Sequence, residues 1–257
     1  MPTITPTPTM RERLAAGETL VGTFLGLGSP AAAEACAYAG LDWVLVDLEH
    51  GTAGDEALLA QLMGARAAGV HGLVRIAAPE RIRAGRALDL GAEGIMFPRI
   101  TSIQEARDAA GALRHSPGGL RGVAGGHRGH AFGLAFDPAA ADERTLGIIQ
   151  VEHPGAVAAA EEIAALDAAD VLFVGPNDLS YAMGIPRQLD HPDFRAAVER
   201  VVAAAEGAGK AAGIMVSGPE GIAGAAADGF RMIAVTSDLG LLLRAAREVA
   251  EAARALS

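Results

Sequence analysis

Eight short apolar runs recur along this chain, and each is followed by turn residues and then by an alanine-rich helical stretch. The runs are almost continuously hydrophobic, which is typical of parallel strands that are buried on both faces. Strands that alternate with helices indicate an α/β fold, and eight such units predict a closed (β/α)₈ TIM barrel. The predicted strands span residues 22–27, 43–49, 73–76, 94–100, 147–152, 171–175, 213–217 and 232–237.

A doubly wound sheet is the alternative α/β architecture. Its dinucleotide-binding members carry a glycine fingerprint in the first strand-to-helix turn. The turn over residues 26–30 has only part of that fingerprint, so the barrel is favoured.

The length of 257 residues is typical of a single TIM-barrel domain. Residues 1–10 are rich in threonine and proline, and we expect them to form a flexible N-terminal tail. The barrel domain is then expected over residues 11–257, with an alanine- and leucine-rich helix near its C-terminal end.

The charge balance narrows the range of partners. A net charge of −10 disfavours nucleic acid and anionic membrane surfaces, and no run of basic residues opposes that conclusion. The N-terminus lacks the basic start and apolar core of a signal peptide, and no apolar run approaches the ~20 residues of a membrane helix. Cys36 is the single cysteine, which excludes an intramolecular disulfide. Together these features predict a cytoplasmic protein.

Polar and charged residues stand at the predicted C-terminal ends of the strands. In a TIM barrel those ends meet at one rim, where active sites lie. Buried strands that end in polar groups therefore predict a single site at this rim. Its candidate residues, in chain order, are Asp47, Glu49, His50, Arg75, Arg99, Gln150, Glu152, His153, Asn177, Asp178, Ser217, Ser237 and Asp238.

Glu152 and Asp178 stand one strand–helix unit apart, so they end neighbouring strands and their carboxylates can share one ion. Two carboxylates without cysteine or an evident histidine pair suit a hard cation such as Mg²⁺ or Mn²⁺. The alternative is that both residues cap helices or form salt bridges.

Lys210 is the only lysine of the chain, and its position bears on the chemistry. A barrel that makes or breaks carbon–carbon bonds beside a carbonyl needs a Schiff-base lysine or a divalent metal. Lys210 precedes the seventh strand, at the end away from the predicted rim. The sequence therefore favours a metal.

His50, Arg75 and Asp89 are the predicted catalytic side chains. A neutral His50 imidazole could act as a general base near neutral pH, with Asp89 as a candidate to fix its tautomer. Arg75 lies inside an apolar strand and so needs an anionic partner, which could be a substrate carboxylate or an enolate oxygen. The alternatives are a His50 that is hydrogen-bonded to a loop and an ion pair of Arg75 with Glu49.

The stretch over residues 117–130 is rich in glycine, carries basic residues and has almost no apolar core residues. Long loops at an active rim often cover the substrate, and we expect that role here. A disordered loop is the alternative.

These motifs resemble those of the HpcH/HpaI family of class II pyruvate aldolases, within the phosphoenolpyruvate/pyruvate barrel superfamily. The resemblance runs from Leu20 to the end of the chain. The loop 126–133 and residues 237–240 look most like the branch that cleaves 5-keto-4-deoxy-glucarate and related 2-keto-3-deoxy sugar acids. Phe24, where some members have tryptophan, and Asn177, where many have a small residue, depart from the family pattern. The segments that carry the resemblance are 22–27, 40–50, 74–75, 88–92, 121–123, 150–152 and 175–180.

The resemblance implies reversible, metal-dependent aldol cleavage of 4-hydroxy-2-oxo acids to pyruvate and an aldehyde. The substrates would be 2-keto-3-deoxy sugar acids or 4-hydroxy-2-oxoheptanedioate. The cofactor would be a divalent ion, Mg²⁺ or Mn²⁺ first, with Co²⁺, Ni²⁺ and Zn²⁺ as alternatives. The family is usually a homohexamer, a trimer of dimers, with a C-terminal helix exchanged between subunits. Residues 239–256 would form that helix, and packing on its own barrel is the alternative.

The same resemblance implies which residues bind the metal and the substrate. Glu152 and Asp178 would hold the metal. Backbone amides at Asn177 and Asp178 would take the pyruvate carboxylate, and Gln150 would be a further substrate-binding residue.

It also implies the roles of the catalytic side chains. Arg75 would bind the pyruvyl keto oxygen and stabilise the enolate. His50, paired with Asp89, would manage the proton on the aldehyde or alcohol oxygen.

Two other chemistries stay open. One is a different lyase of the same superfamily, acting on a CoA ester or by decarboxylation. The other is a phosphate-binding barrel isomerase that uses the turns after the seventh and eighth strands, although Glu220 and Asp238 there would repel a phosphate dianion.

Overall fold

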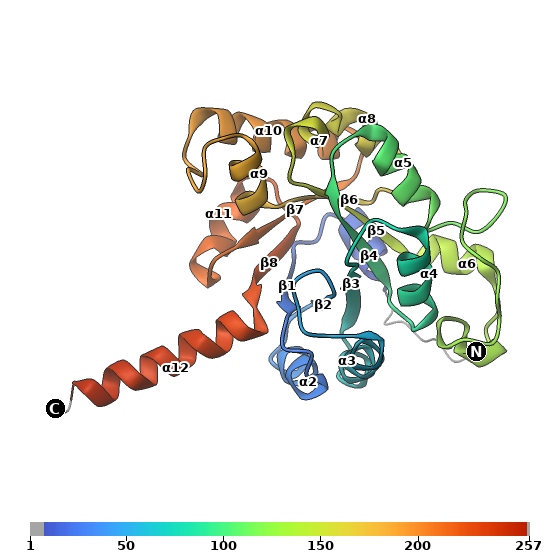
Figure 1. Cartoon of the computed structure of the whole chain (residues 1–257), viewed down its shortest axis with the longest axis horizontal. Coiled ribbons are helices and arrows are strands. Elements are labelled where there is room, and N and C mark those ends of the chain that lie inside the picture. Colours follow the sequence, from blue (N-terminus) through green and yellow to red (C-terminus); the bar gives the residue numbers. More distant parts are fainter. Residues whose placement is uncertain (1–7, 256–257) are drawn as a thin grey trace.

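The computed structural model describes residues 8–255, and its centre is a closed barrel of parallel strands (Figure 1). Each strand pairs with the next one along the chain, and β8 pairs with β1 to close the ring. The predicted TIM barrel is confirmed, and closure excludes the doubly wound sheet. The strands are β1 (Leu20–Leu25), β2 (Trp43–Asp47), β3 (His71–Arg75), β4 (Gly94–Ile100), β5 (Leu146–Val151), β6 (Val171–Val174), β7 (Ala211–Val216) and β8 (Met232–Ser237).

Helices surround the barrel, and local signals start many of them. Proline opens several helices, because its fixed φ suits the first helical position. Ser29 and Ser102 cap the helices that follow them by accepting a backbone N–H. The helices are α1 (Met10–Ala15), α2 (Pro30–Tyr38), α3 (Asp55–Ala67), α4 (Arg81–Asp89), α5 (Ile103–Gly111), α6 (Pro138–Arg144), α7 (Pro154–Ala158), α8 (Ala160–Ala164), α9 (Pro176–Ala182), α10 (Pro192–Gly207), α11 (Ile222–Ala227) and α12 (Asp238–Arg254), with 3₁₀ turns η1 (Arg128–Gly133) and η2 (Pro219–Gly221).

The core has two layers, one inside the barrel and one between the strands and the helices. Trp43 and Phe173 are among the large side chains that fill the interior. Gly22 and Gly213 give these rings space, because a Cβ at either position would collide with the ring of Trp43 or Phe173. The interior is therefore packed with side chains and is not a channel.

The N-terminal segment packs against the barrel from Thr9 onward. Thr9 caps α1 by accepting the N–H of Glu12, and Met10 and Leu14 join the interior layer at the N-terminal end of the strands. Residues 1–7 of the predicted flexible tail lie outside the described residues, so flexibility there stays a prediction.

The loop over residues 112–137 follows α5 and leads into α6, so it starts and ends near the N-terminal end of the barrel. It packs on α4: Arg128 Nη1 donates to the carbonyl of Leu90 at 2.9 Å. The prediction that this loop covers the substrate is therefore wrong within one chain, because the loop does not lie at the active rim. Loops that follow helices lie at the face away from the active rim.

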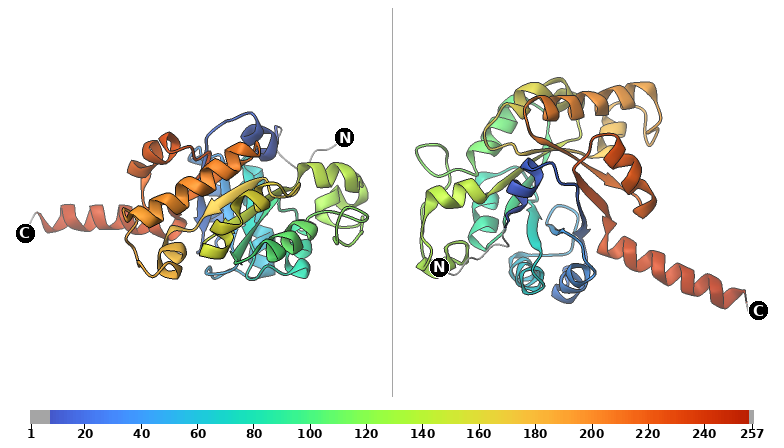
Figure 2. Two further views of the ribbon diagram at one scale, coloured as in Figure 1. Left: turned by 90° about the horizontal axis from the view of Figure 1, so that it is seen from above. Right: turned by 180° about the vertical axis from the view of Figure 1, so that it is seen from behind.

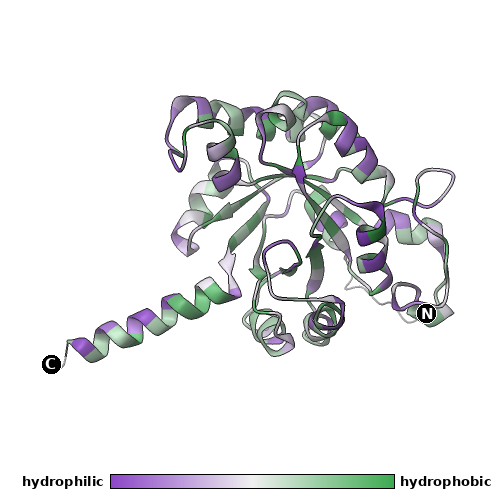
Figure 3. Ribbon diagram, viewed as in Figure 1, coloured by the Kyte–Doolittle hydropathy of each residue, from purple (hydrophilic) through white to green (hydrophobic). Residues whose placement is uncertain are grey.

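Helix α12 leaves the barrel and extends away from it, as two views show (Figures 1 and 2). Apolar side chains recur along this helix (Figure 3). Leu239, Leu242, Leu243 and Val249 are between 44% and 71% exposed. Within residues 8–255, no helix combines the length and the hydropathy that a membrane span requires.

Candidate active site

Arg75 ends β3 beside Asp47, the last residue of β2, because the two strands pair in register at these residues. Asp47 accepts hydrogen bonds from Arg75 Nε at 2.9 Å and from Nη2 at 2.7 Å. Arg75 Nη1 lies 3.1 Å from Glu49 Oε2, and the guanidinium stacks 5.0 Å from the ring centre of Phe24. The ion pair with Glu49 therefore forms, and sequence reasoning missed the stronger partner, Asp47.

Asp47 is ionised and fixes its surroundings. Burial alone would raise its pKa, but the hydrogen bonds and charge of Arg75 outweigh that effect and leave the pKa below its ordinary value. The carboxylate also accepts the backbone N–H groups of Glu49 at 3.0 Å and His50 at 3.2 Å. One side chain thus orients both Arg75 and the segment that carries His50.

His50 lies at the open rim, with 65% of its side chain exposed. Its Nε2 atom is 3.8 Å from Glu49 Oε2, so Glu49 lies between the imidazole and Arg75.

The expected pairing of His50 with Asp89 does not form within one chain. Asp89 ends α4, and its carboxylate lies 3.4 Å from Arg121 Nη2 and 3.2 Å from His127 Nε2. A helix that follows a barrel strand runs back toward the N-terminal face, so its last residue lies far from the rim of the same barrel. In this structure Glu49 is the carboxylate beside His50.

Glu152 directly follows β5 and is 7% exposed. Its Oε1 atom accepts the backbone N–H of Arg99 at 2.6 Å, and its Oε2 atom accepts from Gln150 Nε2 at 2.5 Å. Arg99 has φ of 58°, a left-handed conformation that costs free energy for a residue other than glycine. The backbone of β4 is thus strained where it binds this carboxylate.

The electrostatics of Glu152 favour a nearby cation. Its pKa is raised to about 7: burial is the largest cause, the charges of Asp178 and Glu49 raise the pKa as well, and the Arg99 N–H and the charge of Arg75 lower it in part. Asp178 lies in the first turn of α9, the helix that follows β6, and is exposed. Among residues 8–255, no group of three or more His, Cys, Asp or Glu side chains is arranged to hold a metal ion. Hard oxygen donors with unbalanced negative charge fit a divalent cation.

The turn from β6 into α9 brings further polar groups to Glu152. A Cβ at Gly175 would lie 2.8 Å from Glu152 Oε2, so only glycine lets the turn approach this closely. The N–H groups of Asn177 and Asp178 belong to the first helical turn, where the helix offers no carbonyl to accept them. Gln150 Oε1 is buried without a partner in the described chain. These groups are available to an anionic ligand and to a water or hydroxyl.

The structure disfavours two rival mechanisms, a Schiff base on lysine and phosphate binding at the β8–α12 turn. Lys210 Nζ lies 3.2 Å from the carbonyl oxygen of Asp167, before β7, so the only lysine is absent from the rim. Asp238 accepts the backbone N–H groups of Gly26 at 2.8 Å and Leu27 at 3.2 Å. A phosphate at the β8–α12 turn would have to compete with this carboxylate, which disfavours the isomerase alternative.

Comparison with known proteins gives consistent matches. The family described as HpcH/HpaI aldolase/citrate lyase matches residues 20–245. A hydroxypyruvate/pyruvate aldolase of Paraburkholderia phytofirmans is 37% identical over 95% of this chain and 97% of its own length. A 5-keto-4-deoxy-D-glucarate aldolase of Klebsiella pneumoniae is 32% identical over 93% of this chain and 94% of its own. The glucarate enzyme, the branch favoured from sequence, is thus less similar to this chain than the hydroxypyruvate/pyruvate enzyme.

The fold has the same neighbours. A crystal structure of an HpcH/HpaI aldolase/citrate lyase family protein from Burkholderia cenocepacia superposes with a TM-score of 0.91 at 39% identity. The match covers 95% of this chain and 98% of that one.

Proposed function

This chain belongs to the HpcH/HpaI aldolase/citrate lyase family and is an aldolase, and on that premise we propose that it cleaves 4-hydroxy-2-oxo acids reversibly to pyruvate and an aldehyde. The substrates are 2-keto-3-deoxy sugar acids or 4-hydroxy-2-oxoheptanedioate. The observation that carries the proposal is a buried arginine, held by Asp47 and Glu49, at the same rim as Glu152. No lysine stands at that rim.

Glu152 and Asp178 are the proposed ligands of a divalent ion, Mg²⁺ or Mn²⁺ first, with Co²⁺, Ni²⁺ and Zn²⁺ as alternatives. When bound, such an ion polarises a keto oxygen and stabilises negative charge on it. The raised pKa of Glu152 supports this assignment, because a buried carboxylate beside other carboxylates is destabilised until a cation balances it.

Arg75 and the α9 turn are proposed to bind the pyruvyl part of the substrate. Arg75 donates to the keto oxygen and stabilises the enolate that forms when the carbon–carbon bond breaks. The N–H groups of Asn177 and Asp178 bind the carboxylate, and Gln150 offers its free amide oxygen to a substrate hydroxyl.

His50 is proposed to move the proton on the hydroxyl oxygen that becomes the aldehyde. Its exposed position at the rim lets it exchange protons with solvent, which a reversible acid–base group requires. Glu49 is the nearby carboxylate of the same chain. An Asp89 from a second copy of the chain is the other candidate to orient the imidazole.

Helix α12 supports a homo-oligomer, for which we propose a hexamer built as a trimer of dimers. A barrel helix normally covers its own strands, whereas α12 packs mainly at its start, on β1, β8 and α2, and reaches η2 through the Arg244–Glu220 ion pair. Its exposed leucines would be buried if the helix packed on the barrel of a second copy.

Chelation tests the proposed function. We expect pyruvate release from 2-keto-3-deoxy acids to cease after exhaustive EDTA treatment and to return with Mn²⁺ or Mg²⁺. Borohydride with pyruvate should trap no adduct, and Lys210→Arg should retain wild-type turnover, since Lys210 lies at the far end of the barrel. Turnover that survives chelation, or a trapped adduct on Lys210, would contradict the mechanism.

A further inference from the structure

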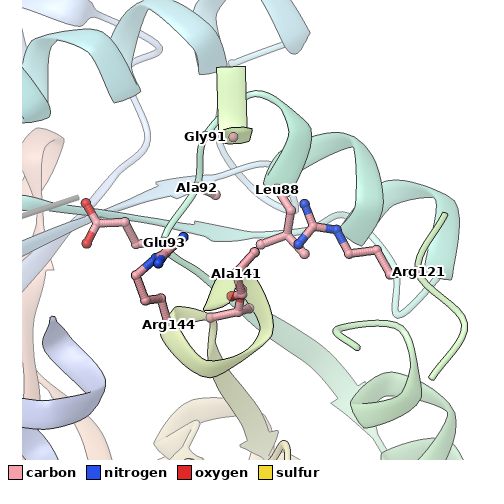
Figure 4. A pocket seen from close by; sticks show the side chains of 9 residues that line it. Leu88, Gly91, Ala92, Glu93, Arg121, Ala141 and Arg144 are labelled. Atoms are coloured by element: carbon pink, nitrogen blue, oxygen red, sulfur yellow. The ribbon is translucent and has the colours of Figure 1, made fainter. Parts of the chain in front are cut away.

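A small cavity of about 30 Å³ lies between the C-terminal end of α4, the loop 112–137 and α6 (Figure 4). Residues 91–93 and Thr145 directly precede β4 and β5, so the cavity lies at the end of the barrel away from the candidate active site. The lining residues are Leu88, Gly91, Ala92, Glu93, Arg121, Gly129, Ala141, Arg144 and Thr145.

Arg121 is a buried cation in this lining. Only 6% of it is exposed, and its Nε–H is buried with no acceptor in the described part of the chain. Its contact with Asp89, from Nη2 to Oδ1, is long at 3.4 Å. Burial lowers the pKa of the guanidinium, and Asp89 and Asp142 offset this only in part. Arg121 therefore carries positive charge that its protein neighbours do not fully balance.

Arg144 supplies a second cation. It ends α6, is half-buried, and makes no side-chain hydrogen bond or ion pair with any residue from 8 to 255. In Figure 4 the guanidinium groups of Arg121 and Arg144 reach toward the cavity from opposite sides. Two cations that face one small space repel each other unless an anion or water lies between them.

The carboxylate in the lining, Glu93, is already engaged with other groups. Its Oε2 atom lies 2.6 Å from His71 Nδ1, and both side chains are buried. Arg128 lies near it as well: burial lowers the pKa of Arg128, and the charge of Glu93 acts in the opposite direction. Glu93 is thus shared with His71 and Arg128 and does not balance Arg121 and Arg144. The local excess is positive, in a chain whose net charge is −10.

We propose that this cavity binds a small anion between Arg121 and Arg144. The volume admits about two water-sized groups at roughly 10–15 Å³ each. It fits a single chloride ion, or two oxygens of a phosphate whose other atoms stay at the mouth, and it excludes larger organic ligands. Arginine donors suit such anions. The anion joins the loop 112–137, through Arg121, to α6, through Arg144, and so fastens the loop to the barrel.

Arg144→Gln is the decisive variant, because Arg144 has no side-chain partner to lose within residues 8–255. Arg83→Gln is the matched control, with the same loss of charge at an exposed position on α4. Each protein is titrated with chloride, and separately with phosphate, against gluconate at constant ionic strength. Binding is measured by ³⁵Cl line broadening or by calorimetry, and Tm is recorded in parallel.

We expect wild type and Arg83→Gln to bind one anion per chain and to gain Tm with its concentration. Arg144→Gln should bind at least ~10-fold more weakly, the effect of losing about 1.4 kcal/mol. Saturable binding in the chloride titration identifies a halide as the ligand, and saturable binding in the phosphate titration identifies an oxyanion. Equal responses in wild type and Arg144→Gln, or no saturable binding in either arm, would overturn the proposal. If Arg144→Gln fails to fold, Arg121→Lys is titrated in the same way. It should also bind the anion more weakly than wild type, and wild-type affinity would overturn the proposal.

Discussion

Arg75 has five N–H donors, and its carboxylate neighbours leave some of them for a ligand. Asp47 accepts from Nε and Nη2, and Glu49 faces Nη1. The remaining donors belong to a planar group that two carboxylates and the Phe24 ring hold in one orientation. A donor that is already oriented needs no reorganisation when charge develops on a substrate oxygen.

We therefore expect Arg75→Lys to lower kcat by at least ~10²-fold, the scale of removing one donor from an oxyanion site. Lysine keeps the charge but loses the planar fork that binds Asp47 and a ligand oxygen together. Asp47→Asn should lower kcat by a smaller factor, because Arg75 remains but loses a charged anchor. Retro-aldol turnover, with circular dichroism to verify folding, measures both. Wild-type kcat in Arg75→Lys would leave Arg75 as a structural ion pair only.

Glu152 should make the metal-free protein less stable as pH rises from 4.5 to about 7. In that range the native state holds a proton that the unfolded chain has lost, so the free energy of unfolding falls by about 1.4 kcal/mol per pH unit. The total loss is about 3 kcal/mol, complete above pH 7. Urea unfolding from pH 4 to 8 measures it. Glu152→Gln should remove this component, and identical pH profiles for both proteins would refute the shifted pKa.

Sequence position predicted Arg75 and Glu152, because each stands at the end of a buried strand, where polar groups converge. Sequence position could not predict the hydrogen bonds between Arg75 and Asp47, because they depend on the register between β2 and β3. Asp89 was expected beside His50 because an imidazole base needs a carboxylate to fix its tautomer, and the family resemblance implied the same pair. Helix α4 runs from the rim back toward the N-terminal face of the barrel, and Asp89 is its last residue. Asp89 and His50 therefore lie at opposite ends of the barrel within one chain.

At the scale of elements, the connections between strands and helices bring the polar groups together. The β4 end adopts a left-handed turn at Arg99 to donate its N–H to Glu152, and the β6–α9 turn passes close to the other oxygen at Gly175. The strand interiors were predictable from their hydrophobicity, and the barrel followed from their number. The strained turn at Arg99 was not predictable, because the left-handed conformation is usually indicated by glycine and an arginine stands there.

Gly175→Ala should weaken binding of Mn²⁺ by about 10-fold or more while the fold persists. The φ of −96° suits alanine, so the backbone is not strained, but the new Cβ would meet Glu152 Oε2 at 2.8 Å and displace the carboxylate. Gly85→Ala, on α4 with nothing within 4 Å of its Cβ, is the control and should retain wild-type affinity. Calorimetric titration of Mn²⁺ compares the three proteins, and unchanged affinity in Gly175→Ala would show that Glu152 is not a ligand.

At the scale of the whole molecule, the two ends of the barrel serve different purposes. The C-terminal ends of the strands carry the candidate active site, whereas the N-terminal end carries Lys210 and the arginine-lined cavity. Helix α12 begins at the C-terminal end of β8 and extends away from the barrel (Figure 1), and its leucine side chains are exposed. Full burial of one leucine side chain is worth roughly 1.5–3 kcal/mol relative to leaving it in water. An interface that covers these leucines would therefore be stabilised by that amount for each one.

Leu242→Glu combined with Leu243→Glu should therefore convert the proposed oligomer into smaller species. The two leucines are 58% and 46% exposed, so the substitutions leave the core of the single chain intact, and circular dichroism should be unchanged. A buried charge without a partner is strongly unfavourable, which disrupts any interface that α12 forms. Glu248→Gln with Glu251→Gln on the same helix is the control. Light scattering after size exclusion gives the mass: a monomeric wild type, or a double-glutamate variant with wild-type mass, would contradict exchange of α12.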